Sequence, residues 1–259
     1  MSTAPDHQHA AISTSPSTPH AAMQPPAALP PVSALDRAFL TNQPGVATLI
    51  LVRHGQQLRP EGPNPAASEW IDPPLSETGR RQAETVGAAL AGDGVEAVYC
   101  SHLERAHETG RQIGLHYGIE PTVLTELREI EMFRDLPEGA RVRDIVPEPV
   151  LVGMRERFVR ERKWDVYPYT ETSAEFRHRV VNVIEGILAL HPGQRVVVAC
   201  HAGVINAYIG HVLGLEEDMF FRPGHASISR VMAGAERRVV HTLNEVHHLK
   251  AMAPELVTF

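Results

Sequence analysis

The 259-residue sequence has only two cysteines, Cys100 and Cys200, and this scarcity limits the classes of protein to which it can belong. Two cysteines do not make the disulfide framework of a small secreted domain. Each cysteine follows an apolar, β-branched segment, and the two are not spaced like the ligands of a metal site. Both are therefore predicted to be buried thiols in a reducing cytoplasm.

Long apolar runs and an excess of positive charge are also absent from the sequence. No stretch approaches the roughly 18 consecutive apolar residues that a membrane-spanning helix requires. The formal net charge of −7 at pH 7 argues against general binding to nucleic acid or to an acidic membrane. We therefore expect no nucleic-acid partner, no membrane association and a cytoplasmic location.

Residues 1–45 differ in composition from the rest of the chain. Residues 1–31 are rich in Ala, Pro, Ser, Thr and His, and lack the basic start and continuous apolar core of a secretory signal. Residues 1–45 are interpreted as a disordered tail in which residues 32–41 can form a short docked helix. Residues 46–259, about 215 in number, suffice for one α/β domain with a large core.

The most informative segment is residues 48–55, Thr-Leu-Ile-Leu-Val-Arg-His-Gly. Its apolar run is typical of a strand buried on both faces of a parallel sheet. The run ends in Arg53, His54 and a glycine. Ligands of open α/β sheets bind just beyond the carboxyl ends of the strands, so a cation and a potential nucleophile stand where chemistry is expected.

Two further segments repeat this arrangement. Residues 195–203 form a β-branched run that ends in His201, and residues 95–105 place Arg105 in the first turn of a helix after a short strand. If the three strands are neighbours in one sheet, two arginines and two histidines meet in one pocket. Arginine binds phosphate oxygens in a bidentate way, and helix N-termini add donors for an anion. The sequence therefore predicts a phosphate pocket.

Six motifs in a fixed order carry a resemblance to a known family. They are Leu-Val-Arg-His-Gly-Gln at 51–56, Asp-Pro-Pro-Leu-Ser-Glu-Thr-Gly at 72–79 followed by Gln-Ala at 82–83, Ser-x-Leu-x-Arg-Ala-x-x-Thr at 101–109, Leu-Arg-Glu at 127–129, Glu-Thr-Ser at 171–173 and His-Ala-Gly-Val at 201–204. Over about residues 46–250 the chain resembles the histidine phosphatase superfamily, in its phosphoglycerate mutase-like branch. The resemblance implies an α/β fold, a three-layer α/β/α sandwich with a mostly parallel central sheet.

The resemblance also implies a two-step reaction without a cofactor or metal ion. His54 would attack phosphorus and form a phosphohistidine, while Arg53, Arg105 and His201 stabilise the phosphate charge. Glu129 would donate a proton to the leaving oxygen and then act as base towards water.

Substrate contacts are likewise carried over from the matching motifs. They are assigned to Arg53, Gln56, Arg105, His201, Ala202 and, in the turn at 220–227, His225. A structural role for His225 stays open, because histidines are common in turns held by hydrogen bonds.

The acid is the least certain member of this set. Residues 126–131 read Glu-Leu-Arg-Glu-Ile-Glu, and the family pattern selects Glu129. The pattern then continues with an aromatic-glycine pair, whereas no glycine follows here until Gly139. Glu131 is therefore kept as the alternative acid.

Three functions are compatible with the sequence. The first is a metal-independent phosphomonoesterase acting on a small phosphorylated substrate. The second is a phosphomutase, against which Pro60 counts, since it replaces the asparagine that usually lies six residues after the histidine nucleophile in mutases. The third, a non-catalytic phospho-ligand binding protein, would have no need of a nucleophile. The family makes a homodimer possible.

Residues 134–170 replace a compact loop of the family, and we expect this insertion to cover the pocket as a lid. Residues 154–164 within it are predicted to be helical and are rich in arginine. Two interpretations stay open: a cationic lid, or a solvated helix with i,i+4 pairs such as Glu156–Arg160. Aromatic residues near the loops, namely Trp70, Phe133, Trp164, Tyr167 and Tyr169, predict a partly aromatic pocket mouth, which suits an organic phosphomonoester.

Overall fold

The computed structural model describes Met1 and residues 32–62, 64–133, 135–137 and 139–259. The prediction of disorder for residues 2–31 lies outside these residues. Within them the strands form a six-stranded sheet in the order β3-β2-β4-β1-β5-β6. The strands are β1 (Ala47–Arg53), β2 (Ala97–Ser101), β3 (Thr122–Leu124), β4 (Arg195–Cys200), β5 (Ile228–Ala233) and β6 (Arg238–Glu245).

The sheet is mostly parallel. Strands β3, β2, β4 and β1 pair in parallel, whereas β5 pairs antiparallel with β1 and β6 antiparallel with β5. The antiparallel pair at one edge follows from its short connection, because consecutive strands joined by a tight turn run in opposite directions. The predicted α/β fold with a mostly parallel central sheet is confirmed.

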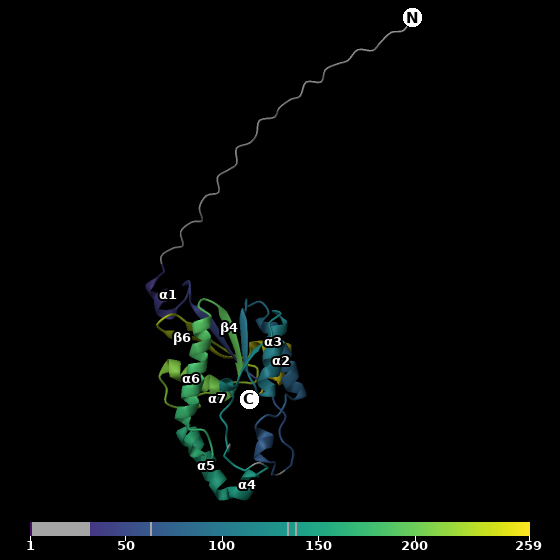
Figure 1. Cartoon of the computed structure of the whole chain (residues 1–259), viewed down its shortest axis with the longest axis vertical. Helices are drawn as coiled ribbons and strands as arrows, with labels where there is room; N and C mark the ends of the chain where they lie inside the picture. The colour runs from purple at the N-terminus through teal and green to yellow at the C-terminus, as the bar shows by residue number, and fades with distance from the viewer. Residues whose placement is uncertain (2–31, 63, 134, 138) are drawn as a thin grey trace. The chain divides into compact units, whose positions relative to one another are not determined.

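Helices cover both faces of the sheet. They are α1 (Ala34–Phe39), α2 (Glu77–Leu90), α3 (Glu104–Leu115), α4 (Val142–Ile145), α5 (Glu148–Glu161), α6 (Ser173–Leu190), α7 (Ala202–Leu213) and α8 (His247–Met252), with short 3-10 helices at Ala67–Trp70, Thr125–Leu127, Trp164–Val166 and Pro254–Leu256. Figure 1 shows α2 and α3 on one side of the sheet and α6 and α7 on the other, with α4 and α5 at the end opposite α1.

Each face of the sheet has its own core. Alternate residues of β1 divide between them: Leu49 and Leu51 pack with α6 and α7, and Ile50 and Val52 pack with α2, α3 and α8. All four side chains are fully buried, as expected for a strand with apolar residues on both faces. These two cores fix the strands whose ends carry the site.

The register of the sheet brings the strand ends level with one another. Arg53, the last residue of β1, pairs with Cys200, the last residue of β4. The next residues along each chain, His54 and His201, therefore leave the sheet side by side. Strand β2 pairs with the other edge of β4, with Cys100 opposite Ala199, so that α3 also starts at this end of the sheet.

A backbone contact between two glycines closes the loop after β1 onto α2. A Cβ on Gly55 would lie 2.3 Å from the carbonyl oxygen of Gly79, and a Cβ on Gly79 would lie 1.9 Å from the carbonyl oxygen of Gln56. No other residue fits at either position. Helix α2 begins here, with the Ser76 side chain accepting a hydrogen bond from the Gly79 amide as N-cap.

The insertion differs in detail from its prediction. Helix α5 spans Glu148–Glu161, so it starts six residues before Met154 and ends before Trp164. Pro149, in the first turn, suits a helix start, and Arg162 ends the helix in the left-handed conformation with φ of 50°. Helix α1 lies within the range 32–41, with Ser33 as its N-cap.

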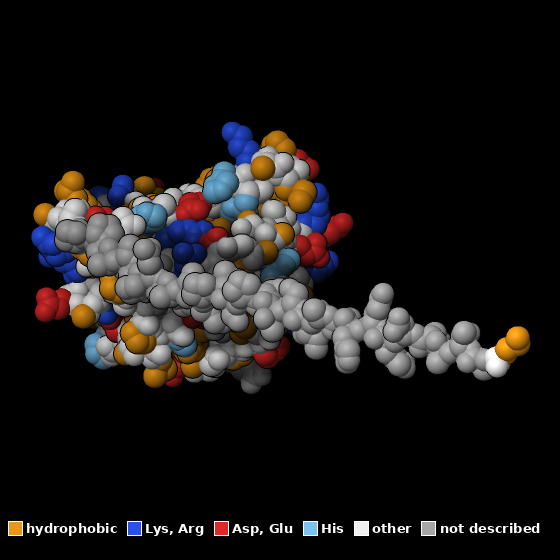
Figure 2. All heavy atoms as spheres, turned by 90° about the horizontal axis from the view of Figure 1, so that it is seen from above, with side chains coloured by type: hydrophobic (Ala, Val, Ile, Leu, Met, Phe, Trp, Pro, Cys, Tyr) orange, Lys and Arg blue, Asp and Glu red, His pale blue; other side chains and the backbone are white. Residues whose placement is uncertain are grey.

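The α-helices of the described residues are between 4 and 18 residues long. None of them combines the length and the apolar composition needed to span a bilayer. Seen from the α1 end (Figure 2), the visible surface intersperses acidic, basic and hydrophobic side chains.

Candidate active site at the strand ends

His54 lies at the centre of the site and is 3% exposed. Its Nδ1 is 2.7 Å from the carbonyl oxygen of Gly55. A carbonyl can only accept, so Nδ1 carries the proton and Nε2 carries the lone pair. The Nε of Arg105 donates to that Nε2 at 3.3 Å. Burial, together with the charges of Arg105, His201 and Arg53, holds the pKa of His54 well below its ordinary value. The imidazole is therefore neutral and can act as a nucleophile through Nε2.

Arg105 lies in the first turn of α3 and is nearly buried. Its Nη1 donates to the carbonyl oxygen of Ile71 at 3.0 Å and lies 3.7 Å from Asp72. Burial lowers the pKa of Arg105, while Glu129 and Asp72 act in the opposite direction. The Ile71 carbonyl and Asp72 therefore hold the guanidinium of Arg105 in place beside His54.

Arg53 is held by the turn before β5. Its Nη1 donates to the carbonyl oxygen of Pro223 at 2.6 Å, and its Nη2 lies 3.0 Å from Nε2 of His225. Its Nε is buried and has no hydrogen-bond partner among the described residues. Burial lowers the pKa of Arg53 to about 10, so the side chain is still charged at neutral pH. One donor of Arg53 is therefore free for an anion.

His201 stands at the N-terminus of α7, and its side chain is fully buried. Its ring centroid lies 5.1 Å from that of His54. Neither of its ring nitrogens has a hydrogen-bond partner within the described part of the chain. Burial lowers the pKa of His201 well below its ordinary value, with Arg105 and Arg53 acting in the same direction. A buried polar ring without a partner indicates a place for a ligand atom.

The carboxylate of Glu129 lies against the start of α7. Its Oε2 accepts from the amide of Gly203 at 3.1 Å, and its Oε1 accepts from the amide of Ile130 at 3.1 Å. Burial raises the pKa of Glu129, although these two amides and the nearby arginines act to lower it. Its rival Glu131 is 35% exposed and forms an ion pair with Arg128 at 3.1 Å. Of the two, Glu129 has the surroundings that favour a protonated acid.

His225 is a third histidine of the site. Its ring centroid lies 5.9 Å from that of His54, and its Nδ1 lies 2.8 Å from the hydroxyl of Thr258. Burial lowers the pKa of His225 to about 3, so it is neutral. It accepts from Arg53 through Nε2 and donates to Thr258 through Nδ1. His225 thus contacts an arginine of the site.

Gln56 and Ala202 are placed differently from the other predicted contacts. The Gln56 side chain accepts from the Ser76 hydroxyl at 3.1 Å, and the backbone N–H of Gln56 donates to the side-chain oxygen of Gln82 at 2.7 Å. Ala202 is the first residue of α7. Neither residue lines the cavity in which His54 lies. Gln56 therefore holds the loop after β1 in this structure, with its side chain turned to the start of α2.

A cavity of about 660 Å³ opens above His54. Its lining includes Arg53, Arg105 and Glu129, and, from the predicted aromatic set, Trp70, Phe133, Trp164 and Tyr167. Tyr169 of that set is not part of the lining. Among the described residues no group of three or more His, Cys, Asp or Glu side chains is arranged to hold a metal ion.

Several residues near the site belong to no motif that the sequence reveals. Thr258 was missed because it lies far along the chain from the motifs. Arg59, in the loop after β1, and Arg143, on the short helix α4, also line the cavity. The sequence offers no periodic signal for an irregular loop or for a helix of four residues.

The insertion forms one wall of the cavity, to which Val142, Arg143, Leu151, Arg155, Trp164 and Tyr167 contribute. At its start, the carbonyl oxygen of Ala140 accepts from the amide of Ala67 at 2.8 Å. At its end, the side chain of Asp218 accepts from the amide of Trp164 at 2.8 Å and from the hydroxyl of Ser173. The insertion is thus attached to the rest of the domain at both ends.

Comparison with known families and proteins agrees with this geometry. The model of the histidine phosphatase superfamily (branch 1) matches residues 49–246. The chain is 30% identical over 218 residues to a protein of Hydrogenobacter thermophilus named "Phosphoserine phosphatase 1", covering 78% of this chain and 93% of that one. It is 29% identical over 217 residues to the "Probable phosphoglycerate mutase GpmB" of Cronobacter sakazakii, covering 79% and 96%.

Solved structures show the same fold. The YhfR protein of Bacillus stearothermophilus superposes with a TM-score of 0.64 at 23% identity, covering 78% of this chain and 99% of that one. A mycobacterial glucosyl-3-phosphoglycerate phosphatase superposes with a TM-score of 0.61 at 22% identity, covering 78% and 100%. These likenesses establish the three-layer α/β architecture.

Proposed function

Because the chain belongs to the histidine phosphatase superfamily (branch 1), we propose that it hydrolyses a phosphomonoester, without a metal ion, through a phosphohistidine on His54. The observation that carries this proposal is the tautomer of His54. Its Nδ1 proton is held by the Gly55 carbonyl, which leaves the Nε2 lone pair beside Arg105. An imidazole kept neutral and oriented in this way is an activated nucleophile.

In the first step, the Nε2 lone pair of His54 attacks phosphorus in line with the ester oxygen. The N–P bond forms as the P–O bond to the leaving group breaks. Glu129, whose pKa is raised by burial, gives a proton to the departing oxygen. The products of this half-reaction are a free alcohol, a phosphohistidine and an ionised Glu129.

In the second step, the ionised Glu129 takes a proton from a water molecule as the water oxygen attacks phosphorus. The N–P bond breaks, inorganic phosphate forms, and His54 returns to its neutral state with Glu129 protonated. The same carboxyl group thus serves as acid and then as base.

The charge on the transferred phosphoryl group is met by fixed donors. Arg53 and Arg105 supply positive charge, and His201 supplies a buried ring N–H that has no partner among the described residues. Removing one such preorganised donor typically costs roughly a hundredfold to a thousandfold in rate. These side chains do the work that a bound cation does in many phosphoryl-transfer enzymes.

The substrate we propose is an organic phosphomonoester, because aromatic side chains line the cavity beside the phosphate end. The ring centroids of Phe133 and Tyr167 lie 6.2 Å apart in an edge-to-face contact, and the ring centroid of Phe158, on α5, lies 4.7 Å from that of Trp164. Equal turnover of aryl phosphates and small sugar phosphates would count against this choice of substrate.

A phosphomutase is the second candidate. It is favoured by the relatives named as phosphoglycerate mutases and by the further arginines of the cavity, such as Arg59 and Arg143, which could hold a second phosphate. Pro60 counts against a mutase, because it stands where mutases usually have an asparagine, six residues after the histidine nucleophile.

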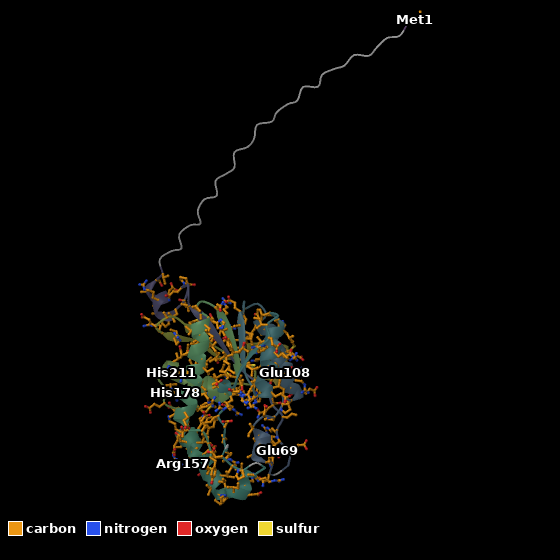
Figure 3. The ribbon with its side chains drawn as sticks, viewed as in Figure 1. Met1, Glu69, Glu108, Arg157, His178 and His211 are labelled. Atoms are coloured by element: carbon orange, nitrogen blue, oxygen red, sulfur yellow. The ribbon has the colours of Figure 1, made fainter. Side chains whose placement is uncertain are left out.

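The test is phosphate release from p-nitrophenyl phosphate in EDTA by the wild type, by His54→Ala and by His211→Ala. His211 lies exposed on α7 (Figure 3) and is the matched control. A phosphatase releases phosphate in the wild type and in the control but not in His54→Ala. Activity that EDTA abolishes, or that survives in His54→Ala, would refute the proposal.

Product analysis separates the two candidates. With a diol monophosphate as substrate, hydrolysis yields free inorganic phosphate in amounts equal to the ester consumed. A mutase instead leaves the phosphate on the neighbouring hydroxyl, and phosphorus NMR distinguishes the two products.

A further inference from the structure

Glu129, the proposed acid, lies in a part of the chain without regular secondary structure. It follows the short 3-10 helix Thr125–Leu127, and residues 128–131 belong to no helix or strand. Its carboxyl group must nevertheless be held within reach of the leaving oxygen, because a misplacement of about 1 Å can cost roughly a hundredfold in rate. The backbone around Glu129 therefore has to be fixed by contacts from another element.

Arg179, on α6, makes these contacts. Its Nη1 donates to the carbonyl oxygen of Arg128 at 3.1 Å and to that of Glu126 at 2.5 Å. The Arg128 carbonyl belongs to the peptide bond that joins Arg128 to Glu129, so the guanidinium group holds the backbone directly before the acid. Helix α6 packs beside α7 (Figure 1), whose first turn receives the Glu129 carboxylate.

The guanidinium of Arg179 is itself fixed by Glu171, which lies just before α6. Its Nε donates to Oε1 of Glu171 at 2.9 Å, and its Nη2 donates to Oε2 at 2.6 Å. The side chains of Arg179 and Glu171 are only 12% and 4% exposed. A two-point contact of this kind sets the plane of the guanidinium, which a single hydrogen bond does not. Glu171 therefore determines the direction in which Nη1 points.

The Phe176 ring, one turn before Arg179 on α6, adds an apolar contact on the other side of Glu129. Its Cζ and the Cδ of Glu129 both lie 3.2 Å from the place that a Cβ on Gly203 would occupy. Ile130, the residue after Glu129, packs in the same apolar core as Phe176. The guanidinium carbon of Arg179 lies 5.0 Å from the centroid of the Phe176 ring. Helix α6 thus contacts the chain both before and after Glu129.

We propose that Arg179, held by Glu171, is a positioning residue for Glu129 and directs its carboxyl group towards the leaving oxygen. Neither Arg179 nor Glu171 is among the described residues that line the cavity, so both act without contacting the substrate. The inference rests on the proposed function, since it concerns the acid of that reaction. A purely structural ion pair affects all substrates alike, whereas loss of positioning affects mainly those substrates whose leaving oxygen needs a proton.

The experiment replaces Arg179 by lysine, which keeps the charge but not the planar set of donors. The charge is kept because it contributes to the lowered pKa of His201. Turnover of p-nitrophenyl phosphate and of 2-phenylethyl phosphate is measured on the same sample, so that the ratio of the two rates does not depend on the folded fraction.

Arg179→Lys is expected to raise the ratio of p-nitrophenyl phosphate turnover to 2-phenylethyl phosphate turnover by about tenfold, which is part of the contribution of a general acid. Inhibition by inorganic phosphate should change less, because the phosphate donors are untouched. Glu171→Gln removes the oxygen that accepts from Nη2 of Arg179 and should raise the same ratio.

Arg177 is the matched control. It lies on the same helix, donates to the carbonyl oxygens of Leu215 and Glu216 at 2.6 and 3.2 Å, and lies 3.5 Å from a carboxylate oxygen of Asp218. Arg177 therefore holds a backbone segment and a carboxylate as Arg179 does, but not the segment that carries Glu129. Arg177→Lys is expected to leave the ratio of the two rates unchanged.

A second measurement does not depend on turnover. The backbone amide of Gly203 donates to Glu129, so its NMR signal reports on the position of that carboxylate. The signal should move in Arg179→Lys, as it does in Glu129→Gln, and stay in place in Arg177→Lys. An unmoved Gly203 signal or an unchanged ratio of rates in Arg179→Lys would overturn the proposal.

Failure of the proposed function has a different signature. In that case p-nitrophenyl phosphate is not hydrolysed, or is hydrolysed by His54→Ala, while the Gly203 signal still reports whether Arg179 positions Glu129. If Glu129→Gln distinguishes the two substrates and Arg179→Lys does not, the acid stands and only the role of Arg179 is refuted.

Discussion

Gly203 lies so close to the carboxylate of Glu129 that no side chain would fit at position 203. A Cβ at Gly203 would lie 2.2 Å from Oε1 of Glu129, while the Gly203 amide donates to the other carboxylate oxygen at 3.1 Å. The glycine therefore permits Glu129 to lie against the start of α7. Since Glu129 is the proposed acid, the position of one proton donor depends on the absence of one methyl group.

Gly203→Ala is expected to lower kcat by tenfold or more with little loss of stability. The atom that must move is the end of a flexible side chain, and alanine suits the first turn of a helix better than glycine does. Activity and the unfolding midpoint measured on the same sample test this. Gly210→Ala, in the same helix, is the control, because no atom outside the helix lies closer than 3.7 Å to a Cβ at this position. Full activity in Gly203→Ala would contradict the proposal that Glu129 acts as the acid from its position against Gly203.

Glu129→Gln is expected to affect substrates according to their leaving group. A general acid contributes about a hundredfold to ten-thousandfold where the leaving oxygen needs a proton, and little where it departs as a stable anion. The variant should therefore lose much more activity on an alkyl phosphate than on p-nitrophenyl phosphate. Glu131→Gln should show no such selectivity, and the reverse result would transfer the role of acid to Glu131.

The pH profile should follow from the opposite pKa shifts of His54 and Glu129. The pKa of His54 is lowered, so this residue stays neutral well below its ordinary pKa of 6.5, and the acid limb of kcat/KM should lie below that value. The pKa of Glu129 is raised above 4.5, so activity should fall as pH rises through that raised value and the proton is lost. Rates for the wild type and Glu129→Gln, corrected for ionisation of the substrate phosphate, test both limbs. Only the alkaline limb should vanish in the variant; an acid limb centred on 6.5 would contradict the assignment for His54.

Thr258 is expected to act on phosphate binding through His225. Its hydroxyl accepts from Nδ1 of His225, which leaves Nε2 of that ring to accept from Arg53. Thr258→Val removes the acceptor and lets the proton move to Nε2, where it would oppose the Arg53 donor. We expect a several-fold rise in KM and weaker inhibition by inorganic phosphate, with kcat less affected. Thr258→Ser should restore the wild-type values, and a Thr258→Val enzyme with unchanged phosphate inhibition would exclude the relay.

Gly79→Ala should harm the fold itself. Its Cβ would meet the backbone oxygen of Gln56 at 1.9 Å, and a backbone cannot move aside as a side chain can. We expect a loss of several kcal/mol in the free energy of unfolding, as for other severe steric changes in a core. Gly186→Ala, on an open face of α6 with no atom within 4 Å, should instead add about 0.5–1 kcal/mol. Denaturant unfolding of both variants measures the contrast.

The strand ends were predictable because their signals are local. The β-branched runs before His54 and His201 specify buried strands, and neighbouring parallel strands present their ends together. The structure brings the two histidines to 5.1 Å between ring centroids. Glu129 was predicted to be the acid only from the family resemblance, because the sequence around it does not distinguish it from the neighbouring glutamates.

The remaining parts of the site depend on long-range contacts. Gln56 stays a predicted substrate contact. Its side chain accepts from the Ser76 hydroxyl, because the close contact of Gly55 with Gly79 brings the start of α2 beside it. The hydrogen bond between His225 and Thr258 connects two segments that share no sequence motif, so it could not be predicted. Within the insertion, helix α5 begins at Glu148 rather than Met154, since a proline at 149 starts a helix that periodicity alone did not reveal.

Hydrogen bonds near both ends of the insertion restrain it from moving about a single hinge. A segment held at one end can swing away as a unit, whereas a segment held at Ala140 and at Trp164 is expected to move only by bending between these two residues. Both attachments, at Ala140 and at Trp164, are therefore expected to restrain the same motion of the insertion. Asp218, buried and outside the lining of the cavity, therefore supports one wall of the cavity without contacting a ligand that binds there.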